Sequence, residues 1–358
     1  MSLSLELIPA RDPRAAEIWH ALAATTSSYF LTSGWMLTWL AMLPRDYAAE
    51  LAVVFDGPQP VGAAFLGRQR QRRHGVLPSR QRHLNASGIA RFDELCIEHN
   101  AIVGDATLLT LLELLPRDWD ELLLPGIPPE LLASPAGTQG APGDPRWRWI
   151  VDRESVAPYV DLERVRASDY VALLGSSTRS QLRRARRNAG PLVIERATTH
   201  ASATDIYDEL IRLHTSRWQE RGEPGAFADP WFTAFHRRLI ADRLDHGEIE
   251  LSRIRAGERV VGCLYNFVWR GRVTFYQSGL AAPLDAHDKP GYLCHAAAIE
   301  AAAASGHAIY DFMSSSDRYK QNLGTAEYRL VWVRIQQPLA RFALEDRVRE
   351  WRRRLRRA

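Results

Sequence analysis

The chain has 358 residues, is 46% hydrophobic and 25% charged, and carries a formal net charge of +4, as is typical of a globular protein with room for two domains. Its longest apolar runs are far shorter than a membrane span, and its first residues lack the basic and apolar regions of a signal peptide, so we expect a cytoplasmic protein. Cys96, Cys263 and Cys294 are odd in number and far apart, which argues against a disulfide framework and a structural zinc site.

Two segments that lie 200 residues apart repeat one pattern. Residues 51–66 and 249–269 each contain an apolar run, a turn with glycine and a second apolar run, which predicts a β-hairpin. Gly57 and Gly257 occupy the same place in the two turns. Each hairpin follows a helical segment that contains tryptophan: Trp35 and Trp39 in the first copy, Trp218 and Trp231 in the second. The shared order predicts that one α/β unit was duplicated.

A stretch rich in proline and glycine, residues 125–145, separates the two copies and is typical of a loop or linker. We place the boundary near residue 160, because residues 147–151 could form a strand that completes the first sheet. The expected domains are therefore 1–160 and 161–340, and a basic helix follows over 341–358.

The second half has a clear order of predicted elements. A basic helix that begins at Ser176 and carries five arginines comes first. Gly306 is a suitable stop for the helix predicted over 291–304. We expect helices over 205–218, 231–244, 291–304 and 317–323, and strands over 249–255, 260–269, 272–278, 308–312 and 328–336.

Short motifs follow one another along nearly the whole chain. They are Phe30, Trp35 and Trp39; Gly88, Asp93 and Ile97-Glu98-His99-Asn100; Leu213-His214, Trp218, Arg221-Gly222 and Gly225-Ala226-Phe227; Leu264-Tyr265-Asn266-Phe267; Tyr276-Gln277-Ser278-Gly279; Lys289-Pro290-Gly291; and Tyr310-Asp311-Phe312 with Tyr319-Lys320. These motifs and the element order resemble the GNAT acyltransferase fold. The doubled unit resembles the FemAB-like branch, which includes a large bacterial family once linked to cellulose biosynthesis. The resemblance implies an α/β fold with a mixed (α+β) sheet and two tandem GNAT-like domains.

Two departures from the family pattern bear on the donor and the acceptor. The usual GNAT pyrophosphate loop is absent before the helix that begins near Gly291, which leaves the identity of the donor open. Family members carry glycines after Asp-Phe, whereas this chain has Met313-Ser314-Ser315-Ser316, which could alter the acceptor pocket.

Only two of the 46 basic residues are lysines, Lys289 and Lys320. In a chain so rich in arginine, a remaining lysine marks a candidate site for a compact ammonium group, and phosphate contact is one such role. Chance survival is the alternative. Because both lysines lie in segments with independent motifs, we favour a functional role.

The predicted donor site combines a helix start with a strand end. A helix N-terminus offers free N–H groups and a positive dipole end to a pyrophosphate, Pro290 suits the first turn, and Gly291 allows close approach. A backbone N–H near Ser278 could bind the donor's carbonyl oxygen. The predicted donor-contacting residues are Gln277, Ser278, Lys289, Pro290, Gly291 and Tyr292.

Three residues are candidates for catalysis. The resemblance implies that Tyr319 protonates the leaving thiolate, although an ordinary half-buried tyrosine is an equal alternative. Asp311 ends a buried strand and could act as base, substrate anchor or structural partner. His287 lies in a loop and could act as a base near neutral pH, whereas a solvated histidine is the commoner case.

Residues for the acceptor follow from their position around the same site. The predicted acceptor-contacting residues are His214, Trp218, Tyr276 and Lys320, with core packing the alternative for Trp218. The arginines of the basic helix could contact the 3′-phosphate of CoA, an anionic acceptor or a tRNA: Arg179, Arg183, Arg184, Arg186 and Arg187.

The sequence therefore predicts an N-acyltransferase that moves an acyl group from a CoA thioester, acetyl-CoA or another acyl-CoA, to a small-molecule or peptide amine by direct attack. The alternatives are an aminoacyltransferase that uses aminoacyl-tRNA and a non-catalytic binding protein with the same fold. The chain has no Walker loop, HExxH motif or Gly-x-Ser-x-Gly elbow, and we expect no metal site.

Overall fold

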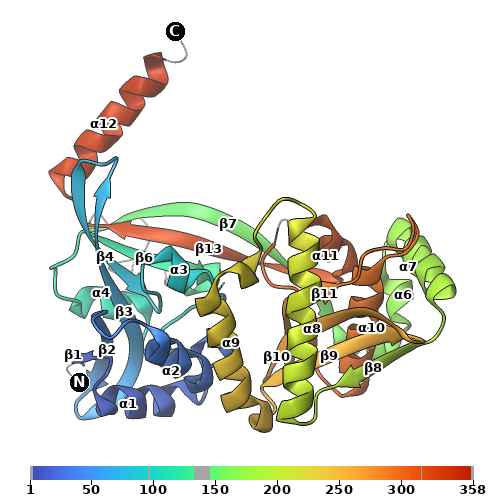
Figure 1. The fold of residues 1–358 in the computed structure, drawn as a ribbon. Coiled ribbons are helices and arrows are strands. Elements are labelled where there is room, and N and C mark those ends of the chain that lie inside the picture. The colour runs from blue at the N-terminus through green and yellow to red at the C-terminus, as the bar shows by residue number, and fades with distance from the viewer. Residues whose placement is uncertain (1–2, 96, 133–145, 316, 356–358) are drawn as a thin grey trace. The chain divides into compact units, whose positions relative to one another are not determined.

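The computed structural model describes residues 3–95, 97–132, 146–315 and 317–355 (Figure 1). The chain divides into two compact units: unit 1 comprises Met1–Glu154 and Leu330–Ala358, and unit 2 comprises Ser155–Arg329. Residue Cys96 and the part of the predicted linker over 133–145 lie outside the described residues.

Unit 1 contains a mixed sheet with the strand order β1-β2-β3-β4-β6-β13. All neighbours are antiparallel except β4 and β6, which are parallel. The strands are β1 (Leu3–Pro9), β2 (Ala49–Asp56), β3 (Gln59–Arg73), β4 (Leu77–Leu84), β6 (Glu121–Ile127) and β13 (Ala326–Gln336), and the short β5 (Val103–Gly104) pairs with β3.

Helices cover this sheet from both sides because its strands alternate in the direction of their side chains. On one face, Trp19 of α1 (Pro13–Ala23) packs on Phe65 of β3, with ring centroids 4.8 Å apart. On the other face, α4 (Leu108–Leu114) joins a buried cluster that includes Leu66 and Leu122. The remaining helices of unit 1 are α2 (Ser33–Met42), α3 (Ala90–Asp93) and α12 (Ala340–Leu355), with short 3₁₀ turns at Tyr29–Leu31 and Pro129–Leu132.

Unit 2 repeats this architecture with the strand order β7-β12-β11-β10-β9-β8. Here β11 and β12 are the parallel pair. The strands are β7 (Arg148–Asp161), β8 (Leu192–Arg196), β9 (Ile249–Ala256), β10 (Arg259–Trp269), β11 (Arg272–Leu280) and β12 (Ile309–Asp311). The helices are α5 (Leu162–Ala167), α6 (Tyr170–Leu173), α7 (Ser176–Ala189), α8 (His200–Gln219), α9 (Pro230–Arg243), α10 (Pro290–Ala304) and α11 (Arg318–Leu323), with 3₁₀ turns η3 (Ala226–Ala228) and η4 (Leu244–His246).

Two helical layers enclose the sheet of unit 2. Helix α8 runs across β9, β10 and β11 (Figure 1), whereas α10, α5, α6 and α7 pack on the opposite face around a core that contains Leu264 and Leu293. The close approach of α8 depends on Gly279, because a Cβ atom there would lie 2.3 Å from the backbone oxygen of Leu210.

The two predicted hairpins are equivalent in detail, which confirms the duplication. Asp56 pairs with Gln59 and Ala256 pairs with Arg259, so each hairpin closes with a two-residue loop. Gly57 and Gly257 have φ of +59° and +56°, as the first central position of a type II′ turn requires. Both copies then shift register two residues after the turn, at equivalent positions.

Local signals explain where the helices of unit 2 begin. Thr199 and Ser202 form a capping box at α8, and Asp229 caps α9 ahead of a proline. Helix α7 begins at Ser176 as predicted; its N-cap is Gly175, and no side-chain hydrogen bond caps it. After α10, Gly306 has a φ of +83°, the left-handed conformation expected of a helix stop.

The two units exchange strands, and this changes the domain boundaries from those predicted. The final strand β13 pairs with β6, with Val331 opposite Ile127, so residues from 330 onward complete the sheet of unit 1. In return, the second part of β7 pairs with β12 in unit 2, with Val160 opposite Tyr310. A division into contiguous segments 1–160 and 161–340 cannot represent this exchange, because strand pairing joins residues far apart in the chain.

Helix α12, predicted as a separate basic helix, belongs to unit 1. Phe342 is buried, and Glu345 pairs with Arg73 at 2.7 Å and with His74 at 2.9 Å. These contacts attach the first half of α12 to the long hairpin formed by β3 and β4.

Candidate active site

One edge of β11 is the structural basis of the candidate site. The parallel pairing of β11 with β12 ends at Thr274, opposite Asp311, whereas its antiparallel pairing with β10 continues to Leu280. Within the described residues, the last part of β11 therefore has a strand partner on one side only. Its backbone groups on the other side are available to a ligand or to side chains.

The direction of the Ser278 backbone follows from its neighbours. Ala281 donates its N–H to the Val261 carbonyl of β10 at 3.0 Å. Because backbone groups alternate along a strand, those of Ser278 must point away from β10. In agreement, the Ser278 carbonyl accepts a hydrogen bond from Nδ1 of His214 at 3.0 Å. The N–H of Ser278 is consequently directed to the same unpaired edge, as the sequence analysis expected for a carbonyl-binding group.

A bulge precedes this position and turns the strand. Tyr265 is opposite Gln277, but Asn266 is opposite Phe275, so Tyr276 is the extra residue. The Tyr276 hydroxyl lies 3.0 Å from Nε2 of the buried His236. Tyr276 thus joins a buried network, and its predicted contact with an acceptor would involve the ring rather than a free hydroxyl group.

The first turn of α10 packs against the end of β11. Lys289 is the N-cap, Pro290 is buried at the first helical position, and a Cβ atom added at Gly291 would lie 3.3 Å from Cδ1 of Leu280. In the described part of the chain, the Lys289 ammonium has neither a hydrogen-bond nor an ion-pair partner. The predicted donor residues Lys289 and Gly291 therefore lie beside the strand end that carries Ser278.

Two other predicted donor residues have different surroundings. Tyr292 is buried in the core of unit 2, and its hydroxyl accepts a 3.4 Å hydrogen bond from Asn322. The structure therefore gives Tyr292 a packing role in place of the predicted contact with the donor. Gln277 is half-buried and directs its backbone groups toward β10, so only its side chain could face a ligand.

His287 lies in an exposed loop before α10. Its Nδ1 atom is 3.4 Å from Nη1 of Arg184, and its backbone N–H donates to the Asp285 carboxylate. Two backbone N–H donors, those of His287 and Asp288, lower the pKa of Asp285. Arg184 and His287 therefore lie together on the exposed surface near the start of α10, and we do not propose His287 as the base.

Tyr319 projects from α11 onto a buried histidine. Its ring stacks on His295 with centroids 5.9 Å apart, and its hydroxyl has no hydrogen-bond partner among the described residues. Burial raises the pKa of Tyr319 above its usual value, while the charge of Arg217 on α8 lowers it. The phenol is therefore protonated at neutral pH, and Arg217 lies near enough to act on it.

Lys320, the second lysine of the chain, also contacts this aromatic cluster. Its ammonium donates to the Phe312 carbonyl at 3.0 Å and lies 5.2 Å from the centroid of the Phe275 ring. The ring of Phe275 in turn packs on His295 at 4.4 Å. Tyr319 and Lys320 therefore meet at the point where β11 and β12 diverge.

Asp311 is a fully engaged carboxylate. It accepts from Nη1 of Arg272 at 2.6 Å, from the Tyr328 hydroxyl at 2.9 and 3.0 Å, and from the backbone N–H of Met313 at 2.8 Å. Of the roles that its sequence position left open, the structural one fits these contacts. Because these contacts engage both oxygens of the carboxylate, we do not propose it as the base.

After Asp311-Phe312 this chain has Met313 where family members carry glycine, and the backbone conformation shows the consequence. Met313 has a φ of +61°, the left-handed region that glycine adopts freely and other residues rarely occupy. The buried side chain of Met313 therefore occupies a backbone position suited to glycine. The conformation of this turn is kept although the residue type is not.

An aromatic wall built by α8 and η3 lies beside the Ser278 edge. His214 packs edge-on against Phe227 with centroids 4.9 Å apart, and Trp218 lies one turn further along α8, 5.7 Å away. The half-buried Trp218 also carries the guanidinium of Arg221 over its ring at 5.6 Å. The predicted acceptor residues His214 and Trp218 thus form one surface next to the predicted donor residues.

Sequence reasoning missed three residues that shape this site. Arg217 lies three positions after His214, a spacing that places both on one face of a helix and could have identified it. Nothing in the local sequence marks Arg272 and Tyr328 as partners of Asp311, because they come from different strands.

Among the residues of unit 1 that the structure describes, no such open edge is seen. At the corresponding position, Asn100 donates its side-chain amide to the Leu84 carbonyl at 2.9 Å and its backbone N–H to the Gly126 carbonyl at 3.0 Å. Asn85 donates to Asn100 at 2.8 Å. Since both asparagines are fully buried, the gap between β4 and β6 is filled by the protein's own polar groups. The site is therefore assigned to unit 2.

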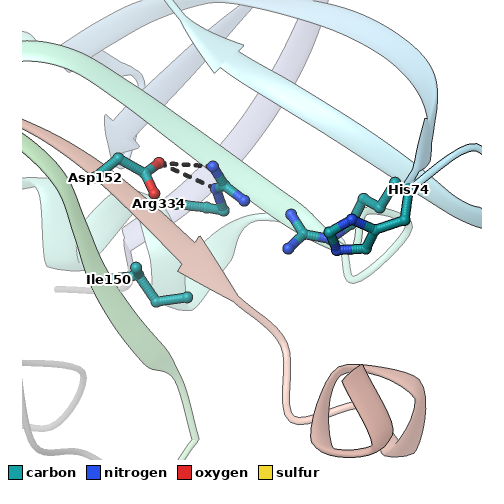
Figure 2. A pocket seen from close by; sticks show the side chains of 5 residues that line it. His74, Ile150, Asp152 and Arg334 are labelled. Carbon is teal, nitrogen blue, oxygen red and sulfur yellow. Dashed lines mark hydrogen bonds and ion pairs between the residues drawn. The ribbon is translucent and has the colours of Figure 1, made fainter. Parts of the chain in front are cut away.

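A hollow of about 360 Å³ in unit 1 has a different character. Figure 2 shows its lining, in which Asp152 pairs with Arg334 at 2.8 Å and His74 faces the same space. The other lining residues are Arg73 and Ile150. Arg73 is also paired, with Glu121 at 2.8 Å. Because its charged groups neutralise one another, we assign no ligand to this hollow.

Two further findings concern the described residues as a whole. No helix among them combines the length and the apolar character needed to cross a bilayer. No group of three or more His, Cys, Asp or Glu side chains within the described ranges could hold a metal ion.

Comparison with known proteins gives a family match for part of the chain and a likeness in fold. Residues 176–321, which contain the candidate site, match the model of the acetyltransferase (GNAT) domain. No curated protein matches the chain. Among solved structures, FemX is 10% identical, with a TM-score of 0.57 over 90% of this chain and 96% of FemX.

Two further structures are related in the same way. L-PGS from Bacillus licheniformis is 9% identical, with a TM-score of 0.53 over 92% of this chain and 93% of that protein. The C-terminal domain of a putative lysylphosphatidylglycerol synthetase from Agrobacterium fabrum is 13% identical, with a TM-score of 0.51 over 93% of this chain and 95% of that one. At these identities the likeness concerns the fold alone. Residues 176–321 are therefore similar to the acetyltransferase (GNAT) domain, and the fold of the chain is similar to that of FemX.

Proposed function

We propose that the protein is an N-acyltransferase that moves an acyl group from a CoA-type thioester to an amine by direct attack. The observation that carries this proposal is the unpaired edge of β11, where the Ser278 N–H points beside the first turn of α10. The edge offers a donor to the carbonyl oxygen, and the helix start offers its N–H groups and Lys289 to phosphates.

The reaction needs stabilisation of negative charge at two places. When the amine attacks, charge develops on the carbonyl oxygen, and a backbone N–H fixed at that point stabilises it without reorganisation. When the carbon–sulfur bond breaks, charge passes to the sulfur. The Tyr319 hydroxyl, protonated and without a partner among the described residues, is the group we assign to protonate it.

The alternative donor is an aminoacyl-tRNA, and one observation favours it. Arg183, Arg184 and Arg187 of α7 are exposed, whereas Arg179 and Arg186 are bound to backbone carbonyls and to Glu300. A row of exposed arginines suits a phosphate backbone. No aromatic residues alternate with them, however, as single-stranded RNA sites usually require, and we therefore prefer the thioester.

Calorimetric titration with CoA, acetyl-CoA and an aminoacyl-tRNA tests the proposal. We expect acetyl-CoA to bind, Lys289→Ala to weaken it about tenfold or more, and Lys289→Arg to weaken it less, since an ion pair with phosphate survives in arginine. Equal wild-type affinity in both variants would remove Lys289 from the donor site. Binding of tRNA alone, collapsing as salt rises, would favour the aminoacyltransferase, and no binding of any donor would favour a non-catalytic protein.

A further inference from the structure

We infer that His214 is the catalytic residue that takes the proton from the attacking amine, through its Nε2 atom. The inference rests on the proposed function and assigns a role that neither the fold nor the family match specifies. It follows from the hydrogen bonds of the imidazole, from the residues that pack around the ring and from the segment that covers Nε2.

The hydrogen bond to Ser278 determines the tautomer of His214. A carbonyl oxygen only accepts, so Nδ1 must carry the proton that is donated at 3.0 Å. In the neutral ring Nε2 then has a free lone pair. This atom is buried, and it has no hydrogen-bond partner among the described residues. A buried acceptor without a partner is rare in native proteins and requires an explanation.

The surroundings keep the ring neutral and therefore able to accept a proton. Its packing partners are Phe227 of η3, Trp218 on its own helix and the backbone of Gly225. Two charged residues, one on α8 and one just after it, are engaged elsewhere: the charge of Arg217 acts on Tyr319, and Arg221 lies over the ring of Trp218. On the other elements Tyr276 and His236 are uncharged neighbours, and burial lowers the pKa of His214.

Access to Nε2 passes the segment that joins α8 to η3. A Cβ atom at Gly225 would lie 3.1 Å from Nε2 and 2.9 Å from Cγ of Trp218, so this residue covers the atom. Gly222 and Gly225 have φ of +75° and +70°, and residues 221–224 are exposed. This exposed segment, which contains Gly222 and is followed by Gly225, is the part of the wall that an amine must displace.

The assignment completes a balanced reaction. The amine nitrogen bonds to the carbonyl carbon and gives its proton to Nε2 of His214. The carbon–sulfur bond breaks, and the sulfur takes the hydroxyl proton of Tyr319. The imidazolium then releases a proton to water and the phenolate takes one from water, which restores both groups and leaves an amide and a thiol.

The test uses His214→Asn, with acetyl-CoA as donor and two amines as acceptors. Asparagine keeps an N–H that can donate to the Ser278 carbonyl but has no basic nitrogen. Benzylamine is protonated at neutral pH and needs a base, whereas hydroxylamine is already a free amine. The control is His200→Asn, at the exposed first residue of the same helix, where histidine pairs only with Asp245.

We expect kcat/KM for benzylamine to fall about 10²–10⁴-fold in His214→Asn, the usual contribution of general base catalysis, and for hydroxylamine to fall much less. Acetyl-CoA affinity and thermal unfolding should match those of His200→Asn. Wild-type rates with benzylamine would overturn the inference. An equal loss with both amines would also overturn it, because His214 would then only position β11.

Failure of the proposed function is recognised separately. If the wild-type protein transfers acetyl groups to neither amine, the acetyl-CoA assignment falls, and ¹⁵N spectra of histidine-labelled protein then decide the question for His214. A His214 Nε2 signal that shifts on addition of benzylamine supports the inference. A signal that benzylamine leaves unmoved contradicts it.

Discussion

Replacing Gly279 with alanine should push α8 away from β11 and disable the site. The added Cβ atom would lie 2.3 Å from the Leu210 oxygen and 2.9 Å from its carbonyl carbon and Cα. These are backbone atoms, so no side chain can rotate out of the way. To restore ordinary van der Waals contact, helix and strand must separate by about 1 Å.

The same displacement would stretch the hydrogen bond between His214 and Ser278, which is 3.0 Å long, beyond bonding distance. Overpacking of this kind costs about 1–3 kcal/mol, and the lost hydrogen bond adds about 1 kcal/mol. A total of roughly 2–4 kcal/mol corresponds to a fall in Tm of about 4–16 °C for a protein unit of this size.

Differential scanning calorimetry and steady-state kinetics measure the two effects. We expect kcat to fall together with Tm, because the proposed acceptor of the amine proton and the strand proposed to bind the carbonyl are no longer in register. A Gly279→Ala variant with wild-type Tm would refute the claim that α8 and β11 are in backbone contact. A lowered Tm with unchanged kcat would refute the role of this contact in the site.

Three further predictions concern other parts of the molecule. In Gly291→Ala, the added Cβ meets only the flexible end of Leu280 at 3.3 Å. Tm should stay unchanged or rise, because alanine favours a helix over glycine by about 1 kcal/mol, yet acetyl-CoA binding should weaken in calorimetric titration. Unchanged affinity would show that the donor does not approach this backbone. Tyr319→Phe should lower kcat by roughly 10²-fold with donor affinity nearly unchanged. This is the low end of general acid catalysis, because a thiolate is a good leaving group and needs less protonation than most. A loss of about twofold or less would make Tyr319 structural. Glu345→Gln should destabilise unit 1 by about 1–3 kcal/mol at pH 7, because it removes a charged partner of Arg73 and His74. Those partners lower the pKa of Glu345 from 4.5 to about 2, so this stabilisation is present above pH 4.5 and disappears as pH falls toward 2; urea unfolding of variant and wild type at both ends of this range should show a difference that shrinks with acid.

The comparison of the two units explains why only one of them is expected to bind donor. Both have a parallel strand pair that diverges, β4 with β6 and β11 with β12. In unit 1, Asn100 bridges the carbonyls of Leu84 and Gly126 across the gap. In unit 2, the side chain of His214 donates to the Ser278 carbonyl at this edge. The buried asparagine thus satisfies the backbone groups that a substrate would otherwise bind.

Several parts of the protein could be predicted from the sequence because their causes are local. The two hairpins follow from apolar strands around a two-residue turn, and the positive φ of Gly57 and Gly257 is a property of glycine itself. The helix that begins at Pro290 and ends before Gly306 is marked at both ends by residues suited to those positions. The edge near Ser278 and the helix start at Lys289 were predicted for the same reason, since both are ends of local elements.

Only the tertiary structure decided the arrangement between distant residues. The exchange of β7 and β13 between the units depends on pairing of Val160 with Tyr310 and of Val331 with Ile127, residues far apart in the chain, which no local pattern encodes. Asp311 became a structural carboxylate because Arg272 and Tyr328 reach it from other strands. Tyr292 packs in the core of unit 2, where Asn322 of α11 donates to its hydroxyl. The free lone pair of His214 depends on Ser278, which is 64 positions away. Local composition determined the elements and their ends, whereas hydrogen bonds between elements determined which side chains remain available for chemistry.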